Sequence, residues 1–192
     1  MRNLIVSEFV SVDGVMEAPG GEPGYKHTGW VIPHSGPEQL TYKLDEVLAA
    51  EALLLGRVTY EGFAEAWPPR KDPEGFADKM NGMPKHVVSS TLSELEWNNS
   101  TLLEGAVPES VRALKETEGG DILVAGSRTL VHALLEHRLV DELRLMVFPV
   151  ILGSGGRVFP DGLEEKTELT LADTQVFPSG VAVLTYRPAQ QG

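Results

Sequence analysis

The stretch from Gly119 to Leu135 constrains the fold most, because it predicts a strand that turns directly into a helix. Ile122 to Ala125 is a short apolar run bounded by glycines, which is typical of a buried strand. Thr129 to Glu136 has helical spacing, with leucines on one side. The residues Gly126 to Arg128 join the two patterns. A sharp strand–helix turn is therefore expected at the centre of the fold.

A turn of this kind can bind a phosphate group. The first N–H groups of a helix have no partner inside the helix, and the helix dipole adds partial positive charge there. Gly126 would let the backbone approach a ligand closely, Ser127 would add a donor and Arg128 a full charge. The alternative is an ordinary strand–turn–helix unit in which Ser127 caps the helix.

Composition narrows the class of protein. The 192 residues predict a single domain over residues 1–192 with a sizeable core. The absence of cysteine excludes disulfide and thiolate chemistry. The net charge of −12 disfavours broad binding to nucleic acid or acidic membranes. Because no apolar run approaches the ~20 residues of a membrane span and no secretion signal is recognisable, we expect a cytoplasmic protein.

Strand and helix patterns alternate along most of the chain. The capping pattern Ser35-Gly36-Pro37-Glu38 predicts a helix with Ser35 at its N-cap and with Leu40, Leu44, Val47 and Leu48 facing the core. Other helices are expected over 58–67, 108–118 and 129–136, with one turn near 72. Strands are expected over 4–12, 52–55, 86–88, 100–103, 122–125, 143–151, 169–177 and 181–186. This order predicts an α/β fold with a mostly parallel central sheet and a C-terminal antiparallel hairpin.

Four turns rich in glycine or polar residues follow separate predicted strands. They are Asp13-Gly14, Gly56-Arg57, Ser89-Ser90 and Gly126-Ser127-Arg128. In open α/β sheets, ligands bind beyond the carboxyl ends of the strands. Because the four turns would share that edge of the sheet, they favour a phosphate-bearing cofactor.

Five sequence segments, taken together, point to a family. They are SVDGV at 11–15, LLGRVTY at 54–60, KHVVSS at 85–90, VAGSRTL at 124–130 and a run from VDEL at 140–143 to FP at 159–160. In this order they resemble the dihydrofolate reductase-like superfamily. The chain is most similar to stand-alone relatives of the reductase domain of the bifunctional riboflavin-biosynthesis deaminase–reductase. The resemblance covers nearly the whole chain and implies a three-layer fold, NADPH and hydride transfer.

The resemblance also implies which residues hold NADPH. Gly56, Arg57 and Thr59 would contact the phosphates. Ser89 and Ser90 would lie by the adenosine ribose and its 2′-phosphate. The pyrophosphate would be bound by Gly126, Ser127, Arg128 and Thr129.

Further residues are implied at the reacting end of the cofactor. Asp13 and Gly14 would open a loop beside the nicotinamide, and Trp30, Tyr60 and the helix from Glu38 would wall the substrate pocket. Asp13 is the first candidate for a substrate contact or proton relay. The alternative for Asp13 is a turn residue that hydrogen-bonds nearby backbone.

One departure from the family pattern bears on the substrate. Dihydrofolate reductases place a carboxylate a few residues after the loop tryptophan, whereas Trp30 is followed by no acidic residue until Glu38. We therefore predict an NADPH-dependent reductase of a small heterocyclic or carbonyl substrate, of the 5-amino-6-(5-phosphoribosylamino)uracil reductase type. Dihydrofolate reductase and a non-catalytic NADP-binding protein are the alternatives.

His34 is a second candidate proton donor, because histidine titrates near neutral pH. The histidine spacings do not converge on a metal site, so no metal is expected. Relatives of this domain tend to be dimers, and the apolar run Leu143 to Ile151 could line a homodimer interface or be a strand buried within one subunit.

Overall fold

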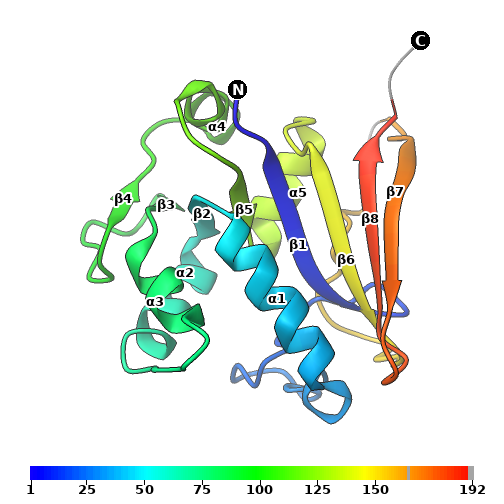
Figure 1. The fold of residues 1–192 in the computed structure, drawn as a ribbon. Coiled ribbons are helices and arrows are strands. Elements are labelled where there is room, and N and C mark those ends of the chain that lie inside the picture. Colours follow the sequence, from blue (N-terminus) through cyan, green and yellow to red (C-terminus); the bar gives the residue numbers. More distant parts are fainter. Residues whose placement is uncertain (164, 190–192) are drawn as a thin grey trace.

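A computed structural model of the protein describes residues 1–163 and 165–189. One eight-stranded sheet runs through it in the order β4-β3-β2-β5-β1-β6-β8-β7 (Figure 1). The first six strands of this order pair in parallel, whereas β8 is antiparallel to both β6 and β7. The predicted sheet, parallel with a closing antiparallel hairpin, is therefore confirmed. The strands are β1 (Leu4–Ser11), β2 (Ala52–Gly56), β3 (Lys85–Val88), β4 (Ser100–Leu102), β5 (Ile122–Val124), β6 (Glu142–Phe148), β7 (Leu169–Val176) and β8 (Ala182–Pro188).

Helices cover both faces of the sheet. One apolar core cluster joins β1 and β5 to α4 and α5, and another joins the opposite side chains of those strands to α1, α2 and α3. The layers are therefore helix, sheet and helix, as predicted. The helices are α1 (Pro37–Ala49), α2 (Arg57–Ala66), α3 (Phe76–Gly82), α4 (Val107–Glu116) and α5 (Arg128–Glu136), with a 3₁₀ turn at η1 (Ile32–His34).

The turn expected near residue 72 extends into the full helix α3. The Asp72 carboxylate accepts the backbone N–H groups of Phe76 at 2.8 Å and Ala77 at 2.7 Å. A carboxylate in this position satisfies two donors that the first helical turn leaves unpaired. Met80 then buries its side chain in the core and fixes the helix against the sheet.

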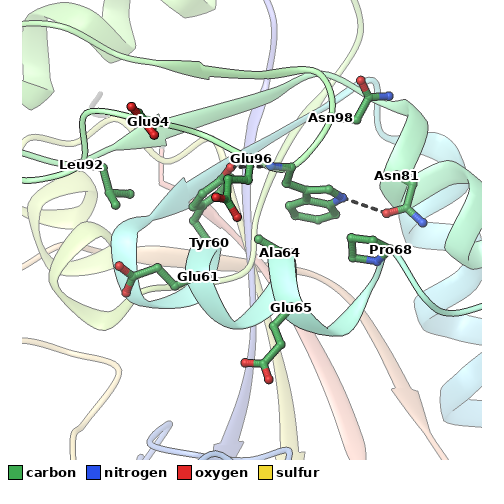
Figure 2. Close-up of a pocket in the computed structure, with 11 residues that line it drawn as sticks. Tyr60, Glu61, Ala64, Glu65, Pro68, Asn81, Leu92, Glu94, Glu96 and Asn98 are labelled. Atoms are coloured by element: carbon green, nitrogen blue, oxygen red, sulfur yellow. Dashed lines mark hydrogen bonds between the residues drawn. The ribbon is translucent and has the colours of Figure 1, made fainter.

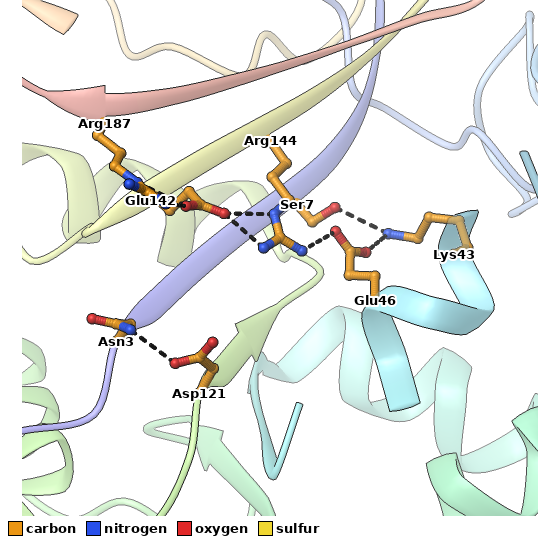
Figure 3. A network of polar contacts seen from close by, with 8 residues as sticks. All are labelled: Asn3, Ser7, Lys43, Glu46, Asp121, Glu142, Arg144 and Arg187. Atoms are coloured by element: carbon orange, nitrogen blue, oxygen red, sulfur yellow. Dashed lines mark hydrogen bonds and ion pairs between the residues drawn. The ribbon is translucent and has the colours of Figure 1, made fainter. Parts of the chain in front are cut away.

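The prediction for α1 is wrong in two respects. Gly36, and not Ser35, is the N-cap residue, and the Ser35 hydroxyl instead donates to the Val31 carbonyl. Leu40 and Leu48 are 62% and 46% exposed, while α1 buries Gln39, Glu46 and Val47. The physical reason is a network of charges under the helix, drawn in Figure 3, in which Glu46 pairs with Lys43 and with Arg144 of β6.

The expected interface strand lies inside the sheet. β6 is paired with β1 on one side and β8 on the other, and Leu143, Met146 and Phe148 are 2–3% exposed. Residues 142–148 therefore form a strand buried within one subunit, which was the alternative to an interface, whereas Ile151 lies beyond β6 and is 75% exposed. Within the described residues, no helix is long and apolar enough to cross a membrane.

Candidate nucleotide-binding site

The four predicted turns lie at one edge of the sheet. The strands that precede them, β3, β2, β5 and β1, are consecutive neighbours and run parallel, so their carboxyl ends point the same way. Gly56 pairs with Val88, the residue directly before Ser89, so the Gly56-Arg57 turn and the Ser89-Ser90 turn lie next to each other. The prediction that the four turns share one edge of the sheet is therefore confirmed, although β1 runs on to Ser11 beyond its pairing with β5 at Val6, so the Asp13 turn lies farther out than the other three.

The closest approach at this edge is between Gly56 and Ser127. A Cβ added to Gly56 would lie 2.1 Å from Ser127 Oγ and 3.1 Å from the Ser127 backbone nitrogen. The Gly56 N–H also donates to the Gly126 carbonyl at 3.3 Å. Glycine fits at position 56 without a shift of the turn, and its lack of a side chain lets the ends of β2 and β5 meet.

Two helices begin at this contact. Gly56 is the N-cap of α2 and Ser127 the N-cap of α5, and neither helix start has a side-chain capping hydrogen bond. Gly126 has a φ of 87°, which favours glycine, and its Cβ position would lie 2.8 Å from Thr59 Oγ1 in the first turn of α2. Two sets of free N–H groups, each at the positive end of a helix dipole, therefore lie side by side.

Arginines begin both helices. Arg57, the first residue of α2, is half-exposed and forms an ion pair with Glu61 at 2.9 Å. Arg128, the first residue of α5, packs against Gly156, whose Cβ position would lie 2.4 Å from Arg128 Nη1. The site therefore combines two helix starts with two cations, which suits a ligand with several phosphates.

The serines after β3 differ in their bonding. Ser89 Oγ accepts the N–H groups of Thr91 at 3.1 Å and Leu92 at 3.0 Å, so it holds the turn that follows the strand. Ser90 is exposed. Thr129 lies in the first turn of α5, one residue after Arg128. All predicted cofactor residues thus sit on the turns or first helical turns at this edge.

Asp13 connects two loops. Its carboxylate accepts the Ser11 hydroxyl at 2.7 Å and the N–H groups of Leu152 at 3.1 Å and Gly153 at 2.8 Å. These hydrogen bonds, that from Ser11 first, lower the pKa of Asp13 to about 2. An ionised carboxylate with its lone pairs engaged holds the loop after β1, which begins at Val12 and includes Gly14, against the loop after β6.

The two aromatic residues predicted to wall the pocket lie in different places. Trp30 is buried near the end of β6, where its ring stands edge-on to Phe148 at 5.5 Å and its Nε1–H donates to the Glu17 carbonyl at 2.8 Å. Tyr60 is buried between α2 and the segment that joins β3 to β4, where its hydroxyl accepts a hydrogen bond from the Trp97 backbone N–H at 3.0 Å. The structure therefore does not bring Trp30 and Tyr60 together.

A groove of about 820 Å³ lies between α2 and the segment that joins β3 to β4 (Figure 2). Tyr60, Leu92 and Trp97 contribute apolar surface, but four glutamates also line it. Negative charge of this density repels a phosphate ligand. The groove is therefore not the candidate cofactor site. The glutamates are Glu61, Glu65, Glu94 and Glu96.

Sequence reasoning missed one residue at this edge. Glu8 lies in the middle of β1 and is only 7% exposed, and no role was predicted for it from the sequence. Strands inside parallel sheets read as continuous apolar runs, so a carboxylate among them was the available signal. Among the described residues, no cluster of His, Asp or Glu side chains is arranged to hold a metal ion.

Comparison with known proteins identifies the fold and the relatives. The model of the RibD C-terminal domain matches residues 2–183. The uncharacterised protein YyaP of Bacillus subtilis (strain 168) is 28% identical over 190 residues, which cover 96% of this chain and 94% of YyaP. A candidate riboflavin biosynthesis protein from Shewanella sp. PV-4 matches with a TM-score of 0.75 and 20% identity, over 99% of this chain and 100% of its own. Dihydrofolate reductase from Enterococcus faecalis, complexed with NADP(H), matches with a TM-score of 0.62 and 18% identity, over 98% and 97%. These matches confirm the dihydrofolate reductase-like fold.

Proposed function

Because the chain belongs to the RibD C-terminal domain family, we propose that it is an NADPH-dependent reductase of a small heterocyclic or carbonyl substrate. The family consists of NAD(P)H-dependent reductases. The proposal extends that class to this chain and chooses NADPH over NADH. It also places the cofactor at the edge where α2 and α5 begin.

The contact between Gly56 and Ser127 is the observation that supports the proposal most. It sets the first turns of α2 and α5 next to each other without a side chain between them. A dinucleotide has two adjacent phosphates, and each fits a helix start with free N–H groups. Single-phosphate ligands would leave one of the two helix starts unused.

This geometry suggests which part of the reaction the cofactor supplies and which the protein residues supply. Bound NADPH supplies the hydride, and the protein supplies binding, orientation and a dry site. Gly56, Thr59 and Ser127 would approach the pyrophosphate through backbone and hydroxyl groups. Arg57, which follows Gly56 beside the turn after β3, would neutralise the charge of the 2′-phosphate, and Ser90 would lie towards the same end. Asp13, by tying two loops together, would position the wall beside the nicotinamide.

We propose a ribosylaminopyrimidine phosphate as the substrate class, specifically 5-amino-6-(5-phosphoribosylamino)uracil. Family membership supports this choice. Dihydrofolate is the second candidate because the fold is shared with dihydrofolate reductase. It is disfavoured because η1 and the residues around it, from Val31 to Pro37, carry no carboxylate to hold a pterin.

Turnover assays with a substrate panel separate the alternatives. NADPH oxidation would be followed with the ribosylaminopyrimidine phosphate, with dihydrofolate and with buffer alone. The proposal expects steady oxidation with the pyrimidine only. Dihydrofolate turnover would support the second candidate, and tight NADPH binding without any turnover would support a non-catalytic NADP-binding protein.

A second copy of the chain is the proposed protein partner. The edge strand β7 exposes Leu171 at 51% and Val176 at 71%, and edge strands offer unpaired backbone groups to a neighbour. Light scattering coupled to gel filtration tests this, since a monomer at micromolar concentration would contradict it. Replacement of Leu171 by lysine should lower the dimer fraction.

A further inference from the structure

Glu8 is a buried carboxylic acid at the centre of the molecule. Glu8 is a residue of β1 and is 7% exposed. Its Oε1 atom has neither solvent contact nor a hydrogen-bond partner among the described residues. A buried acceptor without a partner costs free energy. An unsatisfied buried group of this kind calls for an explanation, and a catalytic role is one such explanation.

The sheet divides next to this residue. Pairing between β1 and β5 ends at Val6 and Val124, whereas pairing between β1 and β6 continues to Ser11. Beyond Val124 the chain turns at Gly126 into α5, so β1 has no strand partner on that side at Glu8. The Gly126 backbone N–H interacts with the Glu8 carboxyl. Glu8 therefore lies in the fork beside the proposed pyrophosphate turn.

Helix α1 approaches the same strand from the opposite face. Lys43 Nζ donates to Ser7 Oγ at 3.0 Å and lies 5.4 Å from the centre of the Phe9 ring, so it is next to Glu8 along the strand. Lys43 also pairs with Glu46, as Figure 3 shows. Because successive side chains of a strand point to opposite faces, Ser7 and Phe9 face α1 and the Glu8 side chain faces the α5 side, where the proposed cofactor turn lies.

The surroundings keep the carboxyl protonated. Burial raises the pKa of Glu8 to about 8, against the opposing effects of Lys43 and the Gly126 N–H, and Glu46 raises it further. Lys43 and Glu46 are the charged groups that act on it; β5 and its turn contribute backbone only. At pH 7 the group can donate a proton, which the fully engaged Asp13 carboxylate cannot do.

We propose that Glu8 donates the proton that accompanies hydride transfer. This inference rests on the proposed reductase function. The substrate receives the hydride of NADPH at the carbon of a C=O or C=N bond, and it receives the Glu8 proton at the oxygen or nitrogen. The π electrons form the new O–H or N–H bond, NADP⁺ and the Glu8 carboxylate remain, and water restores the proton.

Two measurements on Glu8→Gln test the proposal. With 5-amino-6-(5-phosphoribosylamino)uracil as the probe, kcat/KM of the wild type should fall above about pH 8, because only protonated Glu8 is active. Glu8→Gln should lose at least ~100-fold in kcat at pH 7 and should lack that pH dependence. Its dissociation constant for NADPH should be unchanged. Glu8→Asp, which keeps the acid on a shorter chain, should recover part of the rate.

Carbon NMR of protein labelled at the glutamate carboxyls gives a readout without turnover. Glu8, assigned as the signal missing in Glu8→Gln, should titrate near pH 8 in the free protein. Glu109→Gln, on the exposed face of α4, is the control and should change neither measurement.

The outcomes separate this inference from the proposed function. Titration of Glu8 near pH 4, or wild-type turnover by Glu8→Gln, would overturn the role of Glu8 and leave the reductase standing. Failure of the wild type to bind NADPH would overturn both proposals.

Discussion

Gly56 at the end of β2 and Ser127 at the start of α5 are so close that a methyl group on Gly56 would lie 2.1 Å from the Ser127 hydroxyl oxygen. Any larger side chain would force the Ser127 hydroxyl to rotate away, and it would still lie 3.1 Å from the Ser127 backbone nitrogen, so the turn would have to shift by a few tenths of an ångström. The contact sets the spacing between two helix N-termini, and the proposed dinucleotide site depends on that spacing.

Replacement of Gly56 by alanine should therefore weaken NADPH binding by at least ~10-fold and lower the free energy of unfolding by about 1–3 kcal/mol, the usual cost of overpacking. Fluorescence titration and urea denaturation measure the two effects. Gly62→Ala is the matched control in the same helix, since nothing lies within 4 Å of its Cβ position. An unchanged NADPH affinity in Gly56→Ala would contradict the assignment.

Arg57→Ala should weaken NADPH much more than NADH. A guanidinium–phosphate contact contributes about 1.5–3 kcal/mol, so the expected loss is roughly 10- to 100-fold for NADPH. In the free protein Arg57 pairs with Glu61, and that exposed pair contributes little. Calorimetric titration of both cofactors gives the ratio, with Arg112→Ala on α4 as control. Equal losses would remove Arg57 from the 2′-phosphate.

Lys85→Met should destabilise the fold by about 2–4 kcal/mol through three unsatisfied carbonyls. Lys85 is fully buried, and its Nζ donates to the carbonyls of Asn81 at 2.8 Å, Met83 at 2.9 Å and Asn98 at 2.9 Å. Burial lowers the pKa of Lys85 to about 8, so it is charged at pH 7. Urea denaturation should show no comparable loss in Lys71→Met, whose side chain is exposed.

Asp13→Asn should lose stability in a pH-dependent way. The pKa of Asp13 is about 2 in the folded protein and about 3.9 in an unfolded chain. Its contribution is therefore complete above about pH 5 and declines as the pH falls towards 2. The stability difference between wild type and Asp13→Asn should shrink between pH 6 and pH 3 in urea denaturation. A difference that stays constant over this range would show that the Asp13 charge does not hold the loops.

Much of the fold followed from local patterns. The apolar run at Ile122 and the glycine turn after it gave β5 and the start of α5, because a buried parallel strand and a helix leave distinct periodicities. The shared edge of the four turns then followed from parallel pairing, which the structure confirms.

The rest depended on tertiary contacts that no local pattern records. Leucines on α1 suggested a buried face, yet Glu46 turns inwards because Arg144, far along the chain, is there to pair with it. Glu8 received no role from the sequence, since its burial depends on helices that cover both faces of β1. Tyr60 followed the expected helix, but Trp97 decides where its ring packs.

The central claim is that the adjoining starts of α2 and α5 bind the phosphates of NADPH. Titration of ¹⁵N-labelled protein with NADPH, followed through backbone amide signals, tests it most directly. The largest shifts should fall on Arg57 to Thr59 and on Ser127 to Thr129. Saturable binding with the largest shifts on Leu92 to Asn98 along the acidic groove, or no binding at all, would contradict it.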